Sequence, residues 1–125
     1  MNDEPKYKII FYKDRKGNEP VADYIRKLKE MSAKNKDARV NLEKISEYMN
    51  VLKRKGLNAG HPYIGRITDK IWELRPLSNR IFFFGCCGDT FVLLSHFIKK
   101  SQKTPDSEKE KAERLMKRFL TENKL

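Results

Sequence analysis

The apolar residues of this chain change their spacing once along the sequence, and that change limits the possible folds more than any other feature. Between residues 21 and 52 they recur every three or four positions, which is the period of an amphipathic helix. Between residues 67 and 98 they alternate with polar residues over short runs, as in strands. Helices and an antiparallel sheet are therefore expected in separate blocks, which is the α+β class.

The first block is predicted to contain one strand and one helix. Residues 7–12 are rich in β-branched and aromatic side chains, and a turn follows at residues 14–18. Asn18 is predicted to cap a helix that opens with Glu19 and Pro20, because proline is tolerated in the first helical turn. The apolar face of this helix is expected to consist of Val21, Tyr24, Ile25, Leu28 and Met31.

A second helix is predicted after the polar linker at residues 32–36. It should end at Gly56, because glycine suits the left-handed position that follows many helices. Its apolar residues are Ala38, Leu42, Ile45, Met49 and Leu52. A short linker implies an antiparallel hairpin. A coiled-coil rod that binds DNA or a partner is an alternative use of this seam, but packing of the hairpin on a sheet is favoured.

The second block is predicted to contain three antiparallel strands at residues 67–74, 80–87 and 90–98, after a glycine-rich loop at 56–65. Gly88 and Asp89 are expected to form a two-residue hairpin turn. Thr104 should cap a last helix that begins with Pro105 and ends near Glu122. The residues expected on its inward face are Ala112, Leu115, Met116 and Phe119.

The charge of the chain favours a polyanionic partner. Lys and Arg number 28 against 17 Asp and Glu, which gives a formal net charge of +11. A surplus of this size attracts RNA, DNA or an acidic protein, although it does not distinguish among them. The alternative is a basic protein whose charges serve only its solubility.

Several classes of protein are disfavoured by the sequence. No run approaches the roughly 20 apolar residues of a membrane span, and residues 1–5 are too polar and acidic to start a signal peptide. Cys86 and Cys87 are adjacent, so they are expected to stay reduced on opposite faces of a strand, which favours the cytoplasm. His61 and His96 have no second ligand pair nearby, so neither a metal nor a cofactor is expected.

The two predicted turns set a register for the strands. They place Glu73 and Ser95 opposite Phe82, and Arg75 opposite Arg80. One face of the sheet should then display Glu73, Arg75, Arg80, Ser95 and Lys99. The other face should form a core that contains Trp72, Leu74, Ile81, Phe83, Leu94 and His96. A slip by one residue would reverse this assignment.

The pairing of Arg75 with Arg80 suggests an anion site. Like charges directly opposite each other destabilise a sheet, and such violations concentrate at functional sites. A phosphate between the two guanidiniums would relieve the repulsion through paired hydrogen bonds. The alternative is that both arginines are exposed or pair with Glu73.

A basic run from Phe97 to Pro105 extends this surface toward the last helix. Lys100 and Lys103 are candidates for binding a phosphate backbone, together with the positive end of the helix dipole. Arg66 would lengthen the patch, and His61 lies in an accessible loop. His96 is expected to be a structural histidine of the core, and the basic run has a solvated surface as its ordinary alternative.

Three strings of residues resemble the RelE/ParE toxin superfamily, and within it the phage-related HigB-type branch. They are Trp72-Glu73-Leu74-Arg75-Pro76, Arg80-Ile81-Phe82-Phe83-Phe84, and the run from Leu93 to Pro105, Leu-Leu-Ser-His-Phe-Ile-Lys-Lys-Ser-Gln-Lys-Thr-Pro. The order of elements agrees over nearly the whole chain. The resemblance implies a RelE-like fold, with one toxin domain spanning residues 1–125.

The resemblance also implies a function. Toxins of this kind are endoribonucleases that cut mRNA on the ribosome without a metal, by attack of the 2′-hydroxyl on the neighbouring phosphate. A helix-turn-helix, HigA-like antitoxin neutralises them and carries them to operator DNA. By position in the motifs, Arg80 would contact the scissile phosphate, Lys99 would act as the acid or the leaving-group stabiliser, and Arg75 matches the Leu-Arg of the branch.

The sequence departs from RelE where that toxin has lysines before the turn, because Ile71 and Glu73 stand there. The general base is therefore open among Glu73, Lys70 and His61. A ParE-like toxin that inhibits DNA gyrase without cutting RNA is the main alternative function. A basic RNA-binding domain without toxicity is a third.

Overall fold

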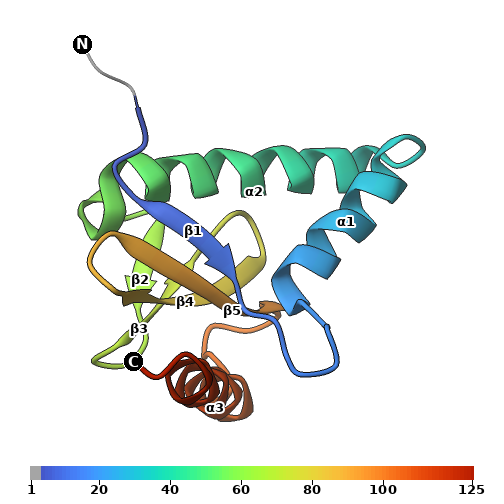
Figure 1. Ribbon diagram of the computed structural model, residues 1–125. Coiled ribbons are helices and arrows are strands. Elements are labelled where there is room, and N and C mark those ends of the chain that lie inside the picture. Colours follow the sequence, from blue (N-terminus) through green and yellow to red (C-terminus); the bar gives the residue numbers. More distant parts are fainter. Residues whose placement is uncertain (1–3) are drawn as a thin grey trace.

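The computed structural model describes residues 4–125 (Figure 1). Residues 1–3, which belong to the polar start considered above, lie outside the described part. The elements in chain order are β1 (Lys8–Phe11), α1 (Pro20–Ser32), α2 (Lys36–Lys55), the 3₁₀ turn η1 (Gly56–Ala59), β2 (Ile64–Arg66), β3 (Ile71–Leu74), β4 (Asn79–Cys86), β5 (Thr90–Ile98) and α3 (Asp106–Glu122).

The strands form one mixed sheet in the order β1-β5-β4-β3-β2. β1 runs parallel to β5, whereas the other neighbours are antiparallel. This confirms the predicted α+β class and a RelE-like arrangement of the elements. The sheet has one strand more than predicted, because the glycine-rich loop contains the short strand β2.

Both faces of the sheet are covered, as Figure 1 shows. The hairpin of α1 and α2 packs on one face around Ile45, Leu52 and Phe83. α3 packs on the other face around Phe82, Leu94 and Leu115. The favoured role of the hairpin, packing on a sheet, is therefore confirmed. α3 also buries an apolar layer on the face that was expected to display Glu73, Arg75 and Arg80, so both faces of the sheet carry a core.

The helix ends are set by local hydrogen bonds. Asn35 caps α2 by accepting the amide of Ala38, and Gly56 follows it at a φ of 58°. The predicted caps of the other two helices were wrong. Glu19 occupies the N-cap position of α1 without a side-chain capping bond, and the Asn18 side chain donates to Asp14 instead. α3 begins after Pro105, and Thr104 is buried. Within residues 4–125, no helix combines the length and apolar character needed to cross a membrane.

The predicted strand at residues 67–74 is in fact a turn followed by β3. The amides of Ile67 and Thr68 donate to the carbonyl of Ile71, and the hydroxyl of Thr68 accepts the amide of Ile71. These bonds close a hairpin between β2 and β3, so only residues 71–74 extend along the sheet.

The hairpin between β4 and β5 also differs from the prediction. Cys86 pairs with Thr90, so the turn has three residues, and Cys87 and Gly88 both have positive φ. A bulge between Phe82 and Phe83 then restores the predicted register farther along. It moves Leu94 to the α3 side. Cys86 and Cys87 are joined by a disulfide, which corrects the expectation of reduced thiols.

Candidate functional site

The candidate site lies on the α3 side of the sheet, at the end where β3 stops and β4 starts. Glu73 pairs with Phe82, Phe82 with Ser95, and Arg80 with Phe97, as the register predicted. Because side chains alternate between faces, Glu73, Arg80 and Ser95 share one face. We call Glu73, Arg75, Arg80 and Ser95 the arginine cluster.

Glu73 is the centre of the arginine cluster. Its side chain is 1% exposed, and its Oε2 atom accepts a hydrogen bond of 2.7 Å from Nε of Arg75. Nε of Arg80 lies 3.9 Å from the same oxygen. Pairing with Glu73, which was the alternative to an anion site, therefore occurs. One carboxylate nevertheless balances only one of two guanidiniums, so the cluster keeps a surplus positive charge.

The strand ladder ends one pair before Arg75 and Arg80 would face each other. The last pair is Leu74 with Ile81, and the amide of Arg75 donates to the carbonyl of Tyr63 instead, at 2.9 Å. The side chain of Arg75 lies across Gly65, where a Cβ atom would overlap its guanidinium. The absence of a side chain at Gly65 therefore lets Arg75 reach Glu73 and remain one-third exposed.

Arg80 is held in place by the turn before its own strand. Its Nη1 atom donates to the carbonyls of Leu77 and Asn79, each at 2.8 Å. Burial lowers the pKa of this guanidinium; Glu73 raises it and Arg75 lowers it further. Guanidinium pKa values are high enough that Arg80 keeps its charge at neutral pH. The hydrogen bonds of Nη1 therefore hold the charged guanidinium of Arg80 beside Glu73.

Three polar atoms of the arginine cluster are buried without a hydrogen-bond partner. They are Oε1 of Glu73, Nε of Arg80 and Oγ of Ser95. Buried polar atoms are almost always paired, and unpaired ones each need a physical explanation. Their concentration around one carboxylate marks the cluster as a place where the fold tolerates destabilising local chemistry, as functional sites do.

The remaining predicted residues divide into those near the cluster and those away from it. The amide of Lys99 donates to the carbonyl of Ser78, which places Lys99 beside the turn that holds Arg80. Lys100 and Lys103 are exposed in the segment that follows. His61 is exposed in the loop whose Tyr63 carbonyl binds Arg75. The structure therefore brings the backbone of Lys99 and the loop of His61 to the end of the sheet that carries the arginine cluster, and Lys100 and Lys103 follow in the chain.

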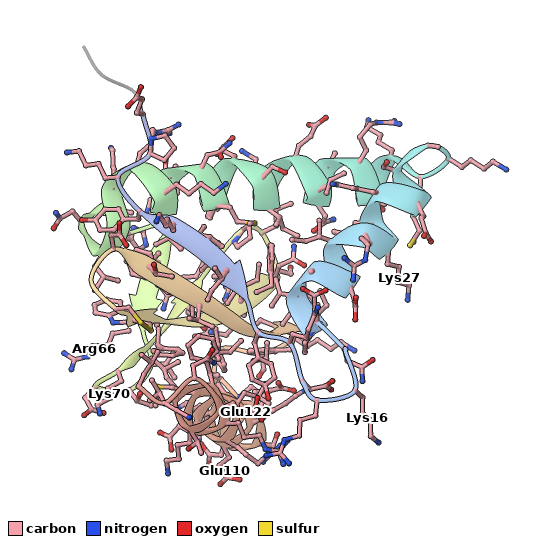
Figure 2. The ribbon with its side chains drawn as sticks, viewed as in Figure 1. Lys16, Lys27, Arg66, Lys70, Glu110 and Glu122 are labelled. Carbon is pink, nitrogen blue, oxygen red and sulfur yellow. A yellow bond between two sulfur atoms is a disulfide. The ribbon has the colours of Figure 1, made fainter. Side chains whose placement is uncertain are left out.

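Arg66 lies away from the arginine cluster. It pairs with Trp72 on the α1–α2 side of the sheet and lies 5.9 Å from the centre of the Trp72 ring. Its guanidinium donates to the carbonyls of Thr68 and Asp69. Figure 2 shows Arg66 close to Lys70 at the turn between β2 and β3. Neither residue faces the arginine cluster.

The start of α3 is less favourable for an anion than its position suggested. Asp106 and Glu108 lie in its first turn. Carboxylates at this position offset the positive end of the helix dipole. Any anion binding in this region would therefore depend on Lys100 and Lys103 rather than on the helix dipole.

Sequence reasoning missed a hydrogen-bonded network on the opposite face. Oδ1 of Asn79 contacts Nε2 of His96 at 2.9 Å and accepts the hydroxyl of Tyr24 at 3.0 Å. Nδ2 of Asn79 donates to Asn41 at 2.8 Å and to the Pro76 carbonyl at 3.0 Å. We call these residues the asparagine network. Only the alternation that placed His96 inward pointed to it.

His96 itself confirms its predicted structural role. Its ring stacks on Tyr24, with centroids 3.7 Å apart. Burial lowers its pKa from 6.5 to about 4, so the imidazole is neutral at physiological pH. Among the described residues, no group of three histidine, cysteine or acidic side chains is arranged to hold a metal ion.

Comparison with known proteins adds one finding. A family model described as "Phage derived protein Gp49-like (DUF891)" matches residues 26–117, well over half of the chain. No curated protein matches the chain. The matched region contains the whole arginine cluster and the lysines that follow β5.

Proposed function

Because the chain belongs to the phage-derived Gp49-like (DUF891) family of RelE/HigB-like type II toxins, we propose that it cuts mRNA on the ribosome. The observation that carries the proposal is the arginine cluster, where two guanidiniums on one face of the sheet share a single buried carboxylate. Two fixed cations with a surplus charge match a phosphodiester that gains negative charge during cleavage.

The proposed reaction needs no group beyond protein side chains. The 2′-hydroxyl of the RNA attacks the adjacent phosphorus, and the bond from phosphorus to the 5′-oxygen of the next nucleotide breaks. Arg80 and Arg75 donate hydrogen bonds to the phosphate oxygens as charge develops on them. Lys99 is two residues after Phe97, the strand partner of Arg80, and alternation places it on the same face. It supplies a proton to the departing 5′-oxygen.

Glu73 is better suited to positioning than to proton transfer. Its carboxylate is 1% exposed, so it does not reach a bound ribose, and it fixes Nε of Arg75 at 2.7 Å. Lys70 lies at the β2–β3 turn beside Arg66 (Figure 2). His61 is exposed in the loop that binds the Arg75 amide. We therefore assign the general base to His61, since imidazole is the commonest base in enzymes.

The proposal also specifies the biological setting. The chain would act in the cytoplasm as one toxin domain on ribosome-bound mRNA, with Lys100 and Lys103 contacting the RNA backbone. A helix-turn-helix antitoxin of the HigA type would neutralise it and bring it to operator DNA. The net charge of +11 suits a partner that presents acidic residues.

Mapping of transcript 5′ ends after induction tests this proposal. The wild-type chain should stop growth and create new 5′ ends within translated messages, whereas Arg80→Ala should do neither and remain folded. Lys27→Ala is a matched control, because Lys27 is an exposed cation on α1 (Figure 2). That helix packs on the opposite face of the sheet from the cluster. Its induction should resemble the wild type.

Two results would contradict the proposal. Growth arrest with intact transcripts and inhibited DNA supercoiling would identify a gyrase inhibitor instead. Normal growth at high expression, with RNA binding retained, would identify a basic RNA-binding domain without toxicity.

A further inference from the structure

A cleft at the C-terminal end of α3 has the chemistry of a second phosphate site. It lies between the loop after β1 and the last turns of α3, and its volume is about 580 Å³. We call it the loop–α3 cleft. The residues that line it are Tyr12, Asp14, Arg15, Lys16, Asn18, Arg118 and Glu122.

The loop side of the cleft is rigid and presents cations. Oδ1 of Asp14 accepts the amides of Lys16 and Asn18, and its Oδ2 accepts the Asn18 side chain. The amide of Asn18 is the main cause of the lowered pKa of Asp14. The carboxylate is therefore ionised and hydrogen-bonded within the loop itself, while the neighbouring Arg15 and Lys16 also line the cleft.

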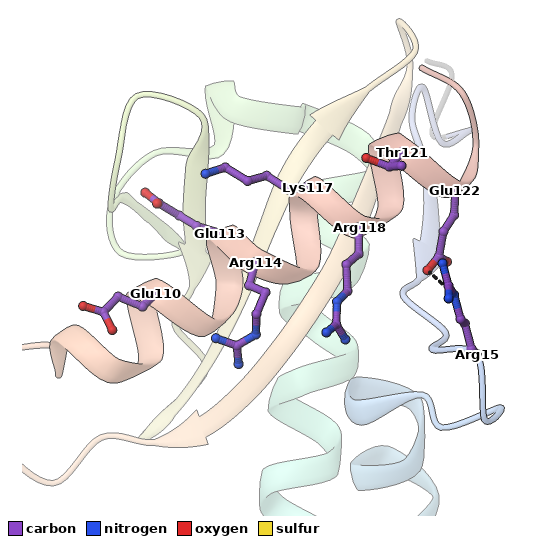
Figure 3. Close-up of a pocket in the computed structure, with 8 residues that line it drawn as sticks. All are labelled: Arg15, Glu110, Glu113, Arg114, Lys117, Arg118, Thr121 and Glu122. Atoms are coloured by element: carbon purple, nitrogen blue, oxygen red, sulfur yellow. Dashed lines mark ion pairs between the residues drawn. The ribbon is translucent and has the colours of Figure 1, made fainter.

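The helix side adds unpaired guanidiniums. Arg118 lines the cleft and also an adjoining cavity that contains Arg114. Figure 3 shows Arg114 and Arg118 on one side of α3, with Glu113 and Lys117 on the other. Neither Arg114 nor Arg118 has a carboxylate partner among residues 4–125. Glu122 is paired with Arg15 at 3.4 Å, but Arg15 is 86% exposed, so this pair is weak.

The strongest sign of a ligand is Tyr12. Its side chain is 2% exposed and lines the cleft, yet its hydroxyl has no hydrogen-bond partner among the described residues. A buried hydroxyl almost always has one. A phosphate oxygen that enters beside Arg118 would accept this hydrogen bond, and it would displace Glu122 from Arg15.

We propose that the loop–α3 cleft binds a phosphate of the same RNA strand that is cut at the arginine cluster. This inference rests on the proposed function. The continuity is provided by the exposed lysines 100 and 103, which lead from the cluster into α3, and by the length of α3, about 25 Å for its 17 residues. A strand that follows α3 would therefore reach both sites.

Binding of two single-stranded RNAs to the full chain tests the inference. One RNA has about 4 nucleotides and the other about 16, the range of known single-strand sites. Arg118→Ala should weaken binding of the long RNA and reduce its salt slope by about 0.7, the value for one phosphate contact. Tyr12→Phe should weaken it roughly tenfold, the effect of one hydrogen bond to a charged group, with an unchanged slope.

The controls separate this inference from the proposed function. Lys111→Ala removes an exposed cation of α3 that lines neither cavity, and it should bind both RNAs like the wild type. Arg80→Ala should weaken the binding of both RNAs. Binding of neither RNA by the wild type would contradict the proposed function. Equal binding of the long RNA by Arg118→Ala and Lys111→Ala would overturn the second site alone.

Tyr12→Phe also distinguishes a ligand site from a structural role. Because the hydroxyl lacks a partner among residues 4–125, its removal should leave the unfolding midpoint in urea unchanged or raise it. A lower midpoint with unchanged RNA affinity would overturn the inference.

Discussion

The arginine cluster and the asparagine network lie at the same end of the sheet on opposite faces, and they treat buried polar atoms differently. In the network, Asn79 is fully buried and both ends of its amide have two partners. In the cluster, three buried polar atoms have none. Fully hydrogen-bonded polar networks stabilise a fold. Buried polar atoms without a partner concentrate at functional sites, where a ligand can supply the missing hydrogen bonds. The difference predicts which face is structural and which is functional.

The largest effect is expected in the network. Asn79→Ala should lower the free energy of unfolding by about 3–4 kcal/mol, because each buried group left unpaired costs roughly 1–3 kcal/mol. Urea unfolding measures it, with Asn58→Ala as the control, since Asn58 is exposed in η1. A loss no greater than that of the control would mean that the network does not stabilise the sheet.

The same network should make stability depend on pH. The pKa of His96 is lowered from the ordinary histidine value of 6.5 to about 4 in the folded chain, so between these values the unfolded chain binds more protons. Stability should therefore decrease as pH falls from 6.5 to about 4, by up to about 3 kcal/mol. Urea unfolding measured at several pH values in this range should show that the stability of His96→Gln depends less steeply on pH than that of the wild type. An identical slope would contradict the assignment.

A smaller loss is expected when the centre of the cluster is changed. Glu73→Gln should lower the free energy of unfolding by about 2 kcal/mol, below the usual range for a broken buried ion pair, because Arg75 reaches solvent. The loss should shrink when phosphate is added, since an anion replaces the carboxylate charge. Insensitivity to phosphate, measured against chloride at equal ionic strength, would count against an anion site.

The smallest effect sharpens the comparison most. Ser95 is as buried as Asn79, but its hydroxyl has no partner. Ser95→Ala should therefore change the free energy of unfolding by less than about 0.5 kcal/mol, or increase it. A loss similar to that of Asn79→Ala would show that the hydroxyl is paired, and the contrast between the two faces would fail.

Local patterns in the sequence were sufficient for most elements and for the face of the cluster. The register from Glu73 to Ser95 followed from two turns, and strand β5 matched its predicted range. The sequence did not predict β2, because strand prediction depends on β-branched and aromatic residues and the centre of this three-residue strand is Gly65. The bulge that moved Leu94 has no local signal, since it compensates for the three-residue turn at Cys87.

The details of the site depended on contacts between distant segments. Glu73 was a candidate general base on the displayed face, but its side chain is 1% exposed and lies against Arg75 and Arg80, which no local pattern reveals. Arg66 was assigned to the patch from its proximity in sequence, yet one residue of alternation places it on the other face. Asn41 and Tyr24 reach Asn79 from two helices, so only the tertiary fold identifies their network.

The most direct test of the account is the rate at which purified protein cuts ribosome-bound mRNA. Arg80→Ala should reduce this rate by at least about 100-fold, the usual effect of removing a group that stabilises developing charge, while a cooperative urea transition shows that the variant still folds. A folded Arg80→Ala variant that cuts within about threefold of the wild-type rate would contradict the claim that the arginine cluster binds the scissile phosphate.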